Sequence, residues 1–419
     1  MKIISLKDNG FLSSVGVVIL LFFFIFGIPT PAGSLTPLLT LGIIFWAIFN
    51  YKKYLLYIPK EALFLFLFLL FDLLVCLVVP VVFATYDFSI IQTKINFIAS
   101  IVATFILAKY LSLNNISDKR FFNLLLSIFT IQITLIIMML LNTDLSQIIT
   151  SFTRSSDQGA RVLESYAGAR GLGFADSSAF GFAIVMGLFI FISFFSYKNK
   201  FINFKYFIIL VLLGGIASIS AGRTAILGLM LGLFYLLLNF KSLRSFGTLI
   251  SIFLLIVLLF SFLLSIDRQS IQNDTLGYFY SYSMEPILNY IATGNLTSSS
   301  TDALHNMYFP LTEKQYLIGD GRYMEGDSYY MATDAGYMRF ILFYGGVFSL
   351  IIYGYFTYFV SKIAILNKRY SLILIFLLLF SFALHYKGEV ILFSISYNKI
   401  LFLVLFFIYI RAVCFSHKV

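Results

Sequence analysis

Two short segments of this 419-residue chain combine arginine with glycine, a pairing suited to binding phosphate groups. Residues 168–181 read GARGLGFADSSAFG and place Arg170 among glycines, which let a backbone approach a ligand closely. Residues 220–225 read SAGRTA, with Arg223 in their middle. The guanidinium group presents a planar fork of N–H donors that matches phosphate oxygens. Both segments predict anion binding, against the alternatives of a flexible turn for the first and contact with lipid headgroups for the second.

A third segment, residues 317–346, holds several carboxylates together with arginine. A carboxylate can orient or deprotonate a hydroxyl group, and we assign this role to Asp334. Asp334 also stands where a helix N-cap belongs, so capping is the competing interpretation. Arg339 follows at a spacing that points the two side chains in different directions on a helix, which argues against mutual neutralisation. His305 is a second candidate acid or base, although a lone loop histidine is more often structural.

The elements that must position these residues are membrane-spanning helices. Hydrophobic residues make up 60% of the chain and charged residues 11%, whereas about a quarter of a soluble domain is charged. The apolar residues come in continuous blocks, and a helix needs about 20 of them to cross the hydrocarbon core. Because barrel strands alternate instead, we predict an all-α polytopic membrane protein with about twelve spans. The expected spans are 11–28, 35–50, 61–83, 95–112, 120–141, 177–196, 204–220, 223–240, 246–266, 336–360, 370–386 and 390–411.

Basic residues predict the orientation of these spans. Most of the Lys and Arg residues fall on short connections of one side, which the positive-inside rule makes cytoplasmic, with both termini on that side. The net charge of +10 is then a topology signal, and it calls for no nucleic-acid partner. On the outer side or within spans, arginine outnumbers lysine, which topology alone does not explain. These arginines are Arg154, Arg161, Arg170, Arg223, Arg268, Arg322 and Arg339.

Two outer segments are long enough to carry a function. Residues 142–176 form one of them, and residues 267–335, between the ninth and tenth spans, form the other, with room for short helices. The aromatic stretch 276–292 is suited to lying in the membrane interface. The chain 1–419 otherwise reads as a single transmembrane domain. We therefore expect the outer face to carry the function.

Polar residues inside the predicted spans point to packing. Asp72 in the third span and Lys399 in the last fall at similar depth, so we expect a buried ion pair between them, with a proton-coupled transporter as the competing use. The adjacent glycines 345 and 346 predict close helix packing. Cys76 lies in a span and the three His residues form no cluster with Cys, so no disulfide and no metal site are predicted.

The combined pattern resembles the Wzy-type polysaccharide polymerases and, more distantly, the O-antigen ligases. Three features carry the resemblance: Arg170 with its glycines before a span, Arg223 in SAGRTA, and GDGR followed by TDAGYMRFILFYGG, which opens a late span after a large outer loop. Ligases of this superfamily usually carry a His in the segment that opens that late helix. Here Asp334 occupies the corresponding place. This departure favours polymerase over ligase.

The resemblance implies a GT-C-like membrane glycosyltransferase in a bacterial cytoplasmic membrane, with its active site facing the periplasm or exterior. Its substrates would be oligosaccharide repeat units carried on undecaprenyl pyrophosphate, assembled into the O-antigen of lipopolysaccharide or into a capsule. A hydroxyl of one repeat unit would attack the anomeric carbon of a growing chain, and the lipid pyrophosphate would leave. The resemblance implies no cofactor, and a chain-length regulator protein is a candidate partner.

The resemblance also assigns roles to individual residues. The leaving group carries charge, so the main need is electrostatic binding. The pyrophosphate-binding candidates are Arg170, Arg223 and Arg339, followed by Arg161 and Arg322. The candidates for acceptor activation are Asp334 and, in reserve, His305. The candidates for stacking on sugar rings are Tyr329, Tyr330 and Tyr337, although interfacial tyrosines are equally typical of membrane proteins.

A flippase for the same lipid-linked repeat unit is the competing function from another class. Twelve spans with both termini inside would suit a flippase. Such transporters are usually built of two similar halves with short outer loops. The long segment 267–335 occurs in one half only, which favours the polymerase.

Overall fold

The computed structural model describes residues 11–153, 168–177, 180–238, 274–295 and 297–415, together with residues 247, 250, 261 and 265. These residues form 16 α-helices and two short antiparallel hairpins, so the predicted all-α class is confirmed. Their contacts divide the chain into two compact units, which we call unit 1 and unit 2. Unit 1 comprises Met1–Thr36 and Ser117–Ser298, and unit 2 comprises Pro37–Ile116 and Ser299–Val419.

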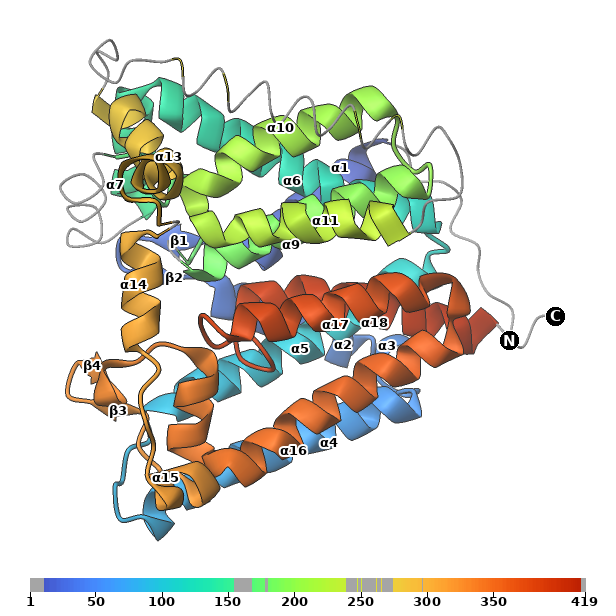
Figure 1. The fold of residues 1–419 in the computed structure, drawn as a ribbon. Helices are drawn as coiled ribbons and strands as arrows, with labels where there is room; N and C mark the ends of the chain where they lie inside the picture. Colours follow the sequence, from blue (N-terminus) through green and yellow to red (C-terminus); the bar gives the residue numbers. More distant parts are fainter. Residues whose placement is uncertain are drawn as a thin grey trace. The chain divides into compact units, whose positions relative to one another are not determined.

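Unit 1 is built around α9 (Phe180–Lys198), a helix with buried apolar side chains on all of its faces. A helix that is apolar all round needs cover on every side, and α6, α10 and α11 pack against it (Figure 1). Close approach depends on glycine, because a Cβ atom at Gly228 would collide with the backbone of Gly187. The elements of unit 1 are α1 (Phe11–Phe26), β1 (Pro29–Thr30), β2 (Gly33–Ser34), α6 (Asp118–Leu141), α7 (Thr143–Thr153), α9, α10 (Phe204–Ala221), η1 (Arg223–Ala225), α11 (Ile226–Leu238) and α13 (Asp274–Thr293).

In unit 2, α18 packs along α5, and α16 packs against α17 and α4 (Figure 1). The 31-residue α16 is broken at Gly345, whose φ of 76° lies in the left-handed region. The elements of unit 2 are α2 (Thr36–Phe49, from Pro37), α3 (Tyr51–Tyr54), α4 (Lys60–Val82), α5 (Ser89–Leu113), α14 (Ser299–Asn306), α15 (Glu313–Ile318), β3 (Met324–Glu325), β4 (Ser328–Tyr329), η3 (Tyr330–Ala332), α16 (Gly336–Leu366), η4 (Lys368–Tyr370), α17 (Ser371–His385) and α18 (Ile395–Phe415).

The break in α16 brings a short helix close to it. A Cβ atom on Gly345 or Gly346 would collide with backbone atoms of α15, and the N–H of Asp320 donates to the carbonyl of Leu342 at 2.7 Å. The close packing predicted for these two glycines is confirmed. Their partner is a helix of the segment 267–335, not another long span.

Eight of the described helices are long and apolar enough to cross a membrane. Three shorter apolar helices, Val15–Phe26, Thr36–Phe49 and Arg223–Leu238, coincide with three more predicted spans. Apart from four single positions, the predicted span 246–266 lies outside the described residues. Along α4, Leu67, Leu74 and Val78 are more than half exposed, an exterior that suits hydrocarbon better than water. The described chain has the make-up of a multi-pass membrane protein.

A buried ion pair in unit 2 corrects the predicted pairing of Asp72 with Lys399. Lys94 Nζ lies 2.7 Å from Asp72 Oδ2, and both side chains are 2% exposed. The Tyr344 hydroxyl donates to Asp72 Oδ1 at 3.0 Å, so both carboxylate oxygens are engaged. The prediction was wrong because α5 begins at Ser89, not near residue 95, which places Lys94 inside the helix.

Lys94 connects more than one helix. Its ammonium lies 5.7 Å from the ring centroid of Phe340, 5.6 Å from that of Tyr344 and 5.3 Å from that of Phe393. It also donates to the carbonyl of Leu392 at 3.5 Å. The ion pair therefore joins α4 and α5 to α16 and to the connection between α17 and α18.

We predict that this ion pair stabilises unit 2. Removing one partner leaves the other charge unpaired in an apolar interior, which costs about 3–5 kcal/mol. Asp72→Leu and Lys94→Met should therefore each lower the thermal unfolding midpoint in detergent, and the double variant should recover most of the loss. Lys52→Met, at an exposed position, is the matched control and should change stability by less than about 0.5 kcal/mol. A double variant no more stable than either single variant would show that the two charges are not coupled.

We also predict the orientation of the chain. Lys200 and His305 are both exposed, and the charge distribution predicts that they lie on opposite sides of the membrane. In a background lacking Cys76 and Cys414, a membrane-impermeant thiol reagent added to spheroplasts should label His305→Cys. Lys200→Cys should be labelled only after lysis. The opposite labelling pattern would invert the topology.

Candidate functional site

Two arginines from separate sequence motifs meet on one aromatic ring in unit 1. The guanidinium carbon of Arg223 lies 4.4 Å from the ring centroid of Tyr282, and that of Arg170 lies 5.4 Å from it. Arg223 Nη1 also donates to the carboxylate of Glu285 and to the carbonyl of Tyr282, the latter at 3.3 Å. Both tyrosine contacts and the carboxylate come from α13, the aromatic helix of the segment predicted to lie in the interface. The structure thus brings Arg170 and Arg223 together.

The position of Arg223 follows from a very short turn. Helix α10 ends at Ala221, and η1 begins at Arg223 and leads directly into α11. Only Gly222 separates them, and its N–H closes the last turn of α10 on the carbonyl of Ser218 at 2.9 Å. This short turn agrees with the predicted spans 204–220 and 223–240, which left only two residues between them.

The glycine-rich segment places Arg170 beside the end of α10. Gly171 N–H donates to the carbonyl of Ser220 at 2.9 Å, and the Ser220 hydroxyl donates back to the carbonyl of Ala169 at 2.8 Å. Gly173 has a φ of 104°, and a Cβ atom there would collide with the side chain of Gln132 on α6. This glycine is therefore required both by its backbone conformation and by the close approach.

Asp176 anchors the other end of the same segment. Its carboxylate accepts hydrogen bonds from the Ser34 hydroxyl at 2.7 Å and from the Thr36 hydroxyl at 2.6 Å. Its N–H donates to the carbonyl of Phe26 at the end of α1 at 2.8 Å. These bonds connect the glycine-rich segment to α1 and the β1–β2 hairpin, so Arg170 is held on a fixed backbone.

A second group of candidate residues lies in unit 2, around Arg339 in the first turn of α16. Its side chain is 4% exposed, and Nε lies 3.3 Å from Oε2 of Glu389. The guanidinium is enclosed by two rings, 3.8 Å from the centroid of Tyr323 and 3.5 Å from that of Tyr329. Such contacts replace water around the cation with aromatic faces and stabilise it by about 2 kcal/mol or more where it is desolvated.

Two carboxylates hold Tyr323 in place. The Tyr323 hydroxyl donates to Glu389 Oε2 at 2.7 Å, and burial together with that carboxylate keeps the pKa of Tyr323 well above its usual value, so the phenol stays a donor. Asp87 accepts the backbone N–H groups of Tyr323 and Met324 at 2.6 and 2.7 Å. Although burial opposes it, the hydrogen bonds from Ser89 and these two N–H groups hold the pKa of Asp87 below its usual value.

The Arg339–Glu389 pair leaves two polar atoms without a hydrogen bond. Among the described residues, neither Arg339 Nη2 nor Glu389 Oε1 has a partner, although both atoms are buried. An unsatisfied buried polar atom costs about 1–3 kcal/mol, more where it is charged. Burial raises the pKa of Glu389, whereas Arg339 and the Tyr323 hydroxyl oppose the rise. Such a costly arrangement is typical of a binding site.

His385 fixes the connection that carries Glu389. Its Nδ1 accepts the N–H groups of Val390 at 3.0 Å and Ile391 at 3.2 Å, so the ring proton belongs on Nε2. Nε2 lies 3.0 Å from the Tyr353 hydroxyl, which accepts that proton. The ring is fully buried, and both nitrogens are engaged within the protein, so we assign it a structural role.

Asp334 lies close to this group but does not cap α16. The N-cap residue is Ala335, which has no side-chain cap bond. The N–H of Ala335 donates to the Thr333 hydroxyl oxygen at 3.3 Å. The capping interpretation of Asp334 is therefore wrong. Its side chain reaches the surface, yet partial burial raises the pKa of the carboxyl, and Arg339 and Lys387 limit the rise.

The remaining predicted residues are dispersed. Arg322 forms a 3.5 Å surface ion pair with Glu325, and its guanidinium lies 5.6 Å from the ring centroid of Tyr330. Tyr337 donates to the carbonyl of Phe382 at 2.9 Å, within the helices of unit 2. His305 lies exposed on α14, and Arg161 falls outside the described residues. No cluster of three or more His, Cys, Asp or Glu that could hold a metal ion occurs in the part of the chain that the structure describes.

Sequence reasoning missed several partners of the predicted arginines. Glu285 and Tyr282 contact Arg223, and Glu389 and Tyr323 contact Arg339. Of these partners, Glu389 could most easily have been identified from the sequence, because a carboxylate between two apolar spans is costly without a cation nearby. Its arginine lies fifty positions earlier in the chain, so no local spacing pointed to it.

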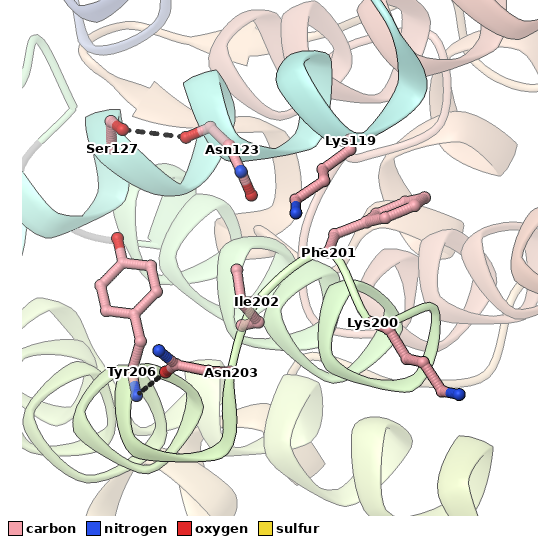
Figure 2. Close-up of a pocket in the computed structure, with 8 residues that line it drawn as sticks. All are labelled: Lys119, Asn123, Ser127, Lys200, Phe201, Ile202, Asn203 and Tyr206. Atoms are coloured by element: carbon pink, nitrogen blue, oxygen red, sulfur yellow. Dashed lines mark hydrogen bonds between the residues drawn. The ribbon is translucent and has the colours of Figure 1, made fainter.

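A polar pocket lies at the other end of α10 in unit 1. It measures about 680 Å³ and is bordered by α6 on one side and by the connection between α9 and α10 on the other (Figure 2). Its lining residues are Lys119, Asn123, Ser127, Lys200, Phe201, Ile202, Asn203 and Tyr206. Lys119 and Lys200 belong to the short basic connections that the charge distribution predicts to be cytoplasmic. Because α10 has 18 residues, it separates this pocket from Arg223 by about 27 Å, close to the thickness of a hydrocarbon core.

Comparisons of the chain with protein-family models, with curated proteins and with solved structures found no match.

We predict that Gly336 is required for the geometry around Arg339. A Cβ atom there would collide with the carbonyl oxygens of His385 and Gly388, which are backbone atoms of the connection that carries Glu389. Gly336→Ala should therefore lower stability by about 1–3 kcal/mol, measured by thermal unfolding in detergent. Gly354→Ala, in the same helix but with open space at its Cβ, is the control and should be neutral or stabilising. Equal effects of the two changes would contradict the close approach.

Proposed function

We propose that this protein polymerises oligosaccharide repeat units carried on undecaprenyl pyrophosphate, by glycosyl transfer at the outer leaflet of a bacterial cytoplasmic membrane. The observation that carries the proposal is the convergence of Arg170 and Arg223 on the ring of Tyr282. The resemblance assigns both motifs to pyrophosphate, and they lie 53 residues apart in the chain. Their meeting in unit 1 supports a common ligand.

The chemistry of this arginine pair suits a pyrophosphate leaving group. Two guanidinium groups offer two planar forks of donors, and a pyrophosphate offers oxygens on two phosphorus atoms. The negative charge of the leaving group is already present in the ground state and shifts to the bridging oxygen as the glycosidic bond breaks. Positioned cations next to that oxygen lower the barrier, and they act most strongly where water is excluded. The Arg223 side chain is only 10% exposed.

The depth of the arginine pair suits a lipid-linked ligand. Arg223 lies at the end of an apolar helix, α10, where the phosphates of membrane lipids would lie. Tyr282 belongs to the aromatic helix α13, and amphipathic aromatic rings favour the membrane interface. A water-soluble nucleotide sugar would not require binding groups at this level. The polyprenyl carrier therefore fits the location better than a soluble donor.

Unit 2 offers groups for the sugars. Arg339, Asp334 and Tyr329 lie at the start of α16, and Tyr329 is 44% exposed. In the proposed reaction, a carboxylate in this group orients or deprotonates the acceptor hydroxyl, and the exposed ring supports a sugar face. These roles accord with the resemblance, in which the segment opening this late helix takes part in transfer.

The proposal predicts the pattern of surface polysaccharide in cells that lack this protein. The glycan ladder on a gel should collapse to a single repeat unit, and the wild-type gene should restore it. Arg223→Ala should fail to restore the ladder at equal protein level, because removing an electrostatic transition-state contact lowers the rate by about 100-fold or more. Arg369→Ala, at an exposed position on the predicted cytoplasmic side, is the control and should restore it.

Each other outcome points to a different function. Loss of every repeat unit from the surface would indicate a ligase or a flippase, because both act on whole units. An unchanged ladder in the absence of the protein would exclude all three. A ladder fully restored by Arg223→Ala would remove that arginine from the mechanism.

A further inference from the structure

The two unsatisfied atoms of the Arg339–Glu389 pair belong to side chains that are already in contact. Nη2 is the neighbour of Nε on the guanidinium, and Oε1 is the neighbour of Oε2 on the carboxylate. Nε and Oε2 are 3.3 Å apart, so the pair is joined at one corner only. A bidentate pair would have joined Nη2 to Oε1 as well. Among the described residues these two atoms find no other partner, and both are buried.

The two atoms have complementary requirements. Nη2 is a donor and needs an acceptor, whereas Oε1 of an ionised carboxylate can only accept. A phosphate would satisfy the arginine but would be repelled by the carboxylate. An ammonium group would satisfy the carboxylate but would be repelled by the arginine. A hydroxyl group satisfies both, because its oxygen accepts from Nη2 while its proton is donated to Oε1.

We propose that Glu389 is the catalytic base for the acceptor hydroxyl of the incoming sugar, and that Arg339 Nη2 holds the oxygen of the same hydroxyl. This assignment rests on the proposed function, and it places Glu389 in the role predicted for Asp334. It also changes the role of Arg339 from binding pyrophosphate to orienting the acceptor.

The proton and electron balance of the step is complete. The hydroxyl oxygen forms a bond to the anomeric carbon of the donor chain as the bond from that carbon to the phosphate oxygen breaks. The electron pair of the broken bond stays on the lipid pyrophosphate, which leaves. The hydroxyl proton passes to Glu389 Oε1 and is later released to water. No oxidant, reductant or metal ion is needed.

The surroundings of Glu389 suit a base better than those of Asp334. The Glu389 side chain is 7% exposed, and Oε2 is fixed by Tyr323 and Arg339, so Oε1 has a single orientation. Asp334 has its side chain at the surface and is less enclosed than Glu389.

Access to the pair involves the hairpin formed by β3 and β4. Tyr329 ends this hairpin and covers one face of the Arg339 guanidinium, while its own side chain is 44% exposed. The hairpin turns at Gly326, whose φ of 60° lies in the left-handed region. A sugar that approaches the pair therefore meets the Tyr329 ring first and displaces it from the guanidinium.

The test uses purified full-length protein in lipid nanodiscs. The probe is the lipid-linked oligosaccharide extracted from cells that lack this protein, and the measurement is the rate of elongated product. Glu389→Gln is the key variant, because the amide oxygen can still accept from Tyr323 and Arg339 while the amide nitrogen cannot take a proton. We expect kcat to fall about 100-fold or more, with KM near that of the wild type. Glu313→Gln, which changes an exposed carboxylate of the outer segment 267–335, is the matched control.

Two further variants keep the outcome decisive. Glu389→Asp retains a carboxylate on a shorter side chain, so it should keep more of kcat than Glu389→Gln. This comparison separates loss of the base from a loss of stability in the Gln variant. Asp334→Asn removes the competing candidate base, and its effect on kcat shows how much the reaction depends on Asp334. The inference is overturned if Asp334→Asn lowers kcat more than Glu389→Gln, or if Glu389→Gln stays within about threefold of the wild type. A wild-type protein that forms no polymer from this probe, by contrast, overturns the proposed function itself.

Discussion

The ion pair between Asp72 and Lys94 is the interaction on which the arrangement of unit 2 depends. A charge inside an apolar bundle is tolerated only with a partner, so these two residues fix α4 against α5. Lys94 also binds the carbonyl of Leu392, in the connection between α17 and α18. Glu389 belongs to the same connection and holds Arg339. The charges at the candidate site are thus positioned by charges deeper in the bundle.

Aromatic rings take the place of the water that would surround these arginine side chains at an open surface. Arg223 lies on Tyr282, and Arg339 lies between two tyrosine rings. A guanidinium with such cover keeps one orientation, so little reorganisation is needed when a ligand binds. The same rings restrict access, which suits a reaction that must exclude water as a competing acceptor.

Local patterns predicted the elements well and their long-range contacts poorly. Continuous apolar blocks located the described spans, and SAGRTA located the one-residue turn at Arg223. The start of α5 was placed too late, since polar residues precede its apolar part, and this one error misassigned the partner of Asp72. Glu389 could not be linked to Arg339 from spacing, because the pairing arises from packing of α16 against α17 and the connection that follows it.

The lysines and the arginine at the two ends of α10 differ in hydration. Lys119 and Lys200 border an open, polar pocket at one end of α10, where a strongly hydrated ammonium keeps its water. Arg223 lies at the other end of the same helix and Arg339 at the start of α16, both largely removed from solvent. The guanidinium group is weakly hydrated and tolerates that loss when hydrogen bonds and aromatic faces replace water. The positive-inside rule makes no distinction between lysine and arginine, so it does not by itself explain an arginine at either end of α10. Arginine at these two dry positions therefore fits the proposed binding of a specific group better than a general attraction to the membrane surface.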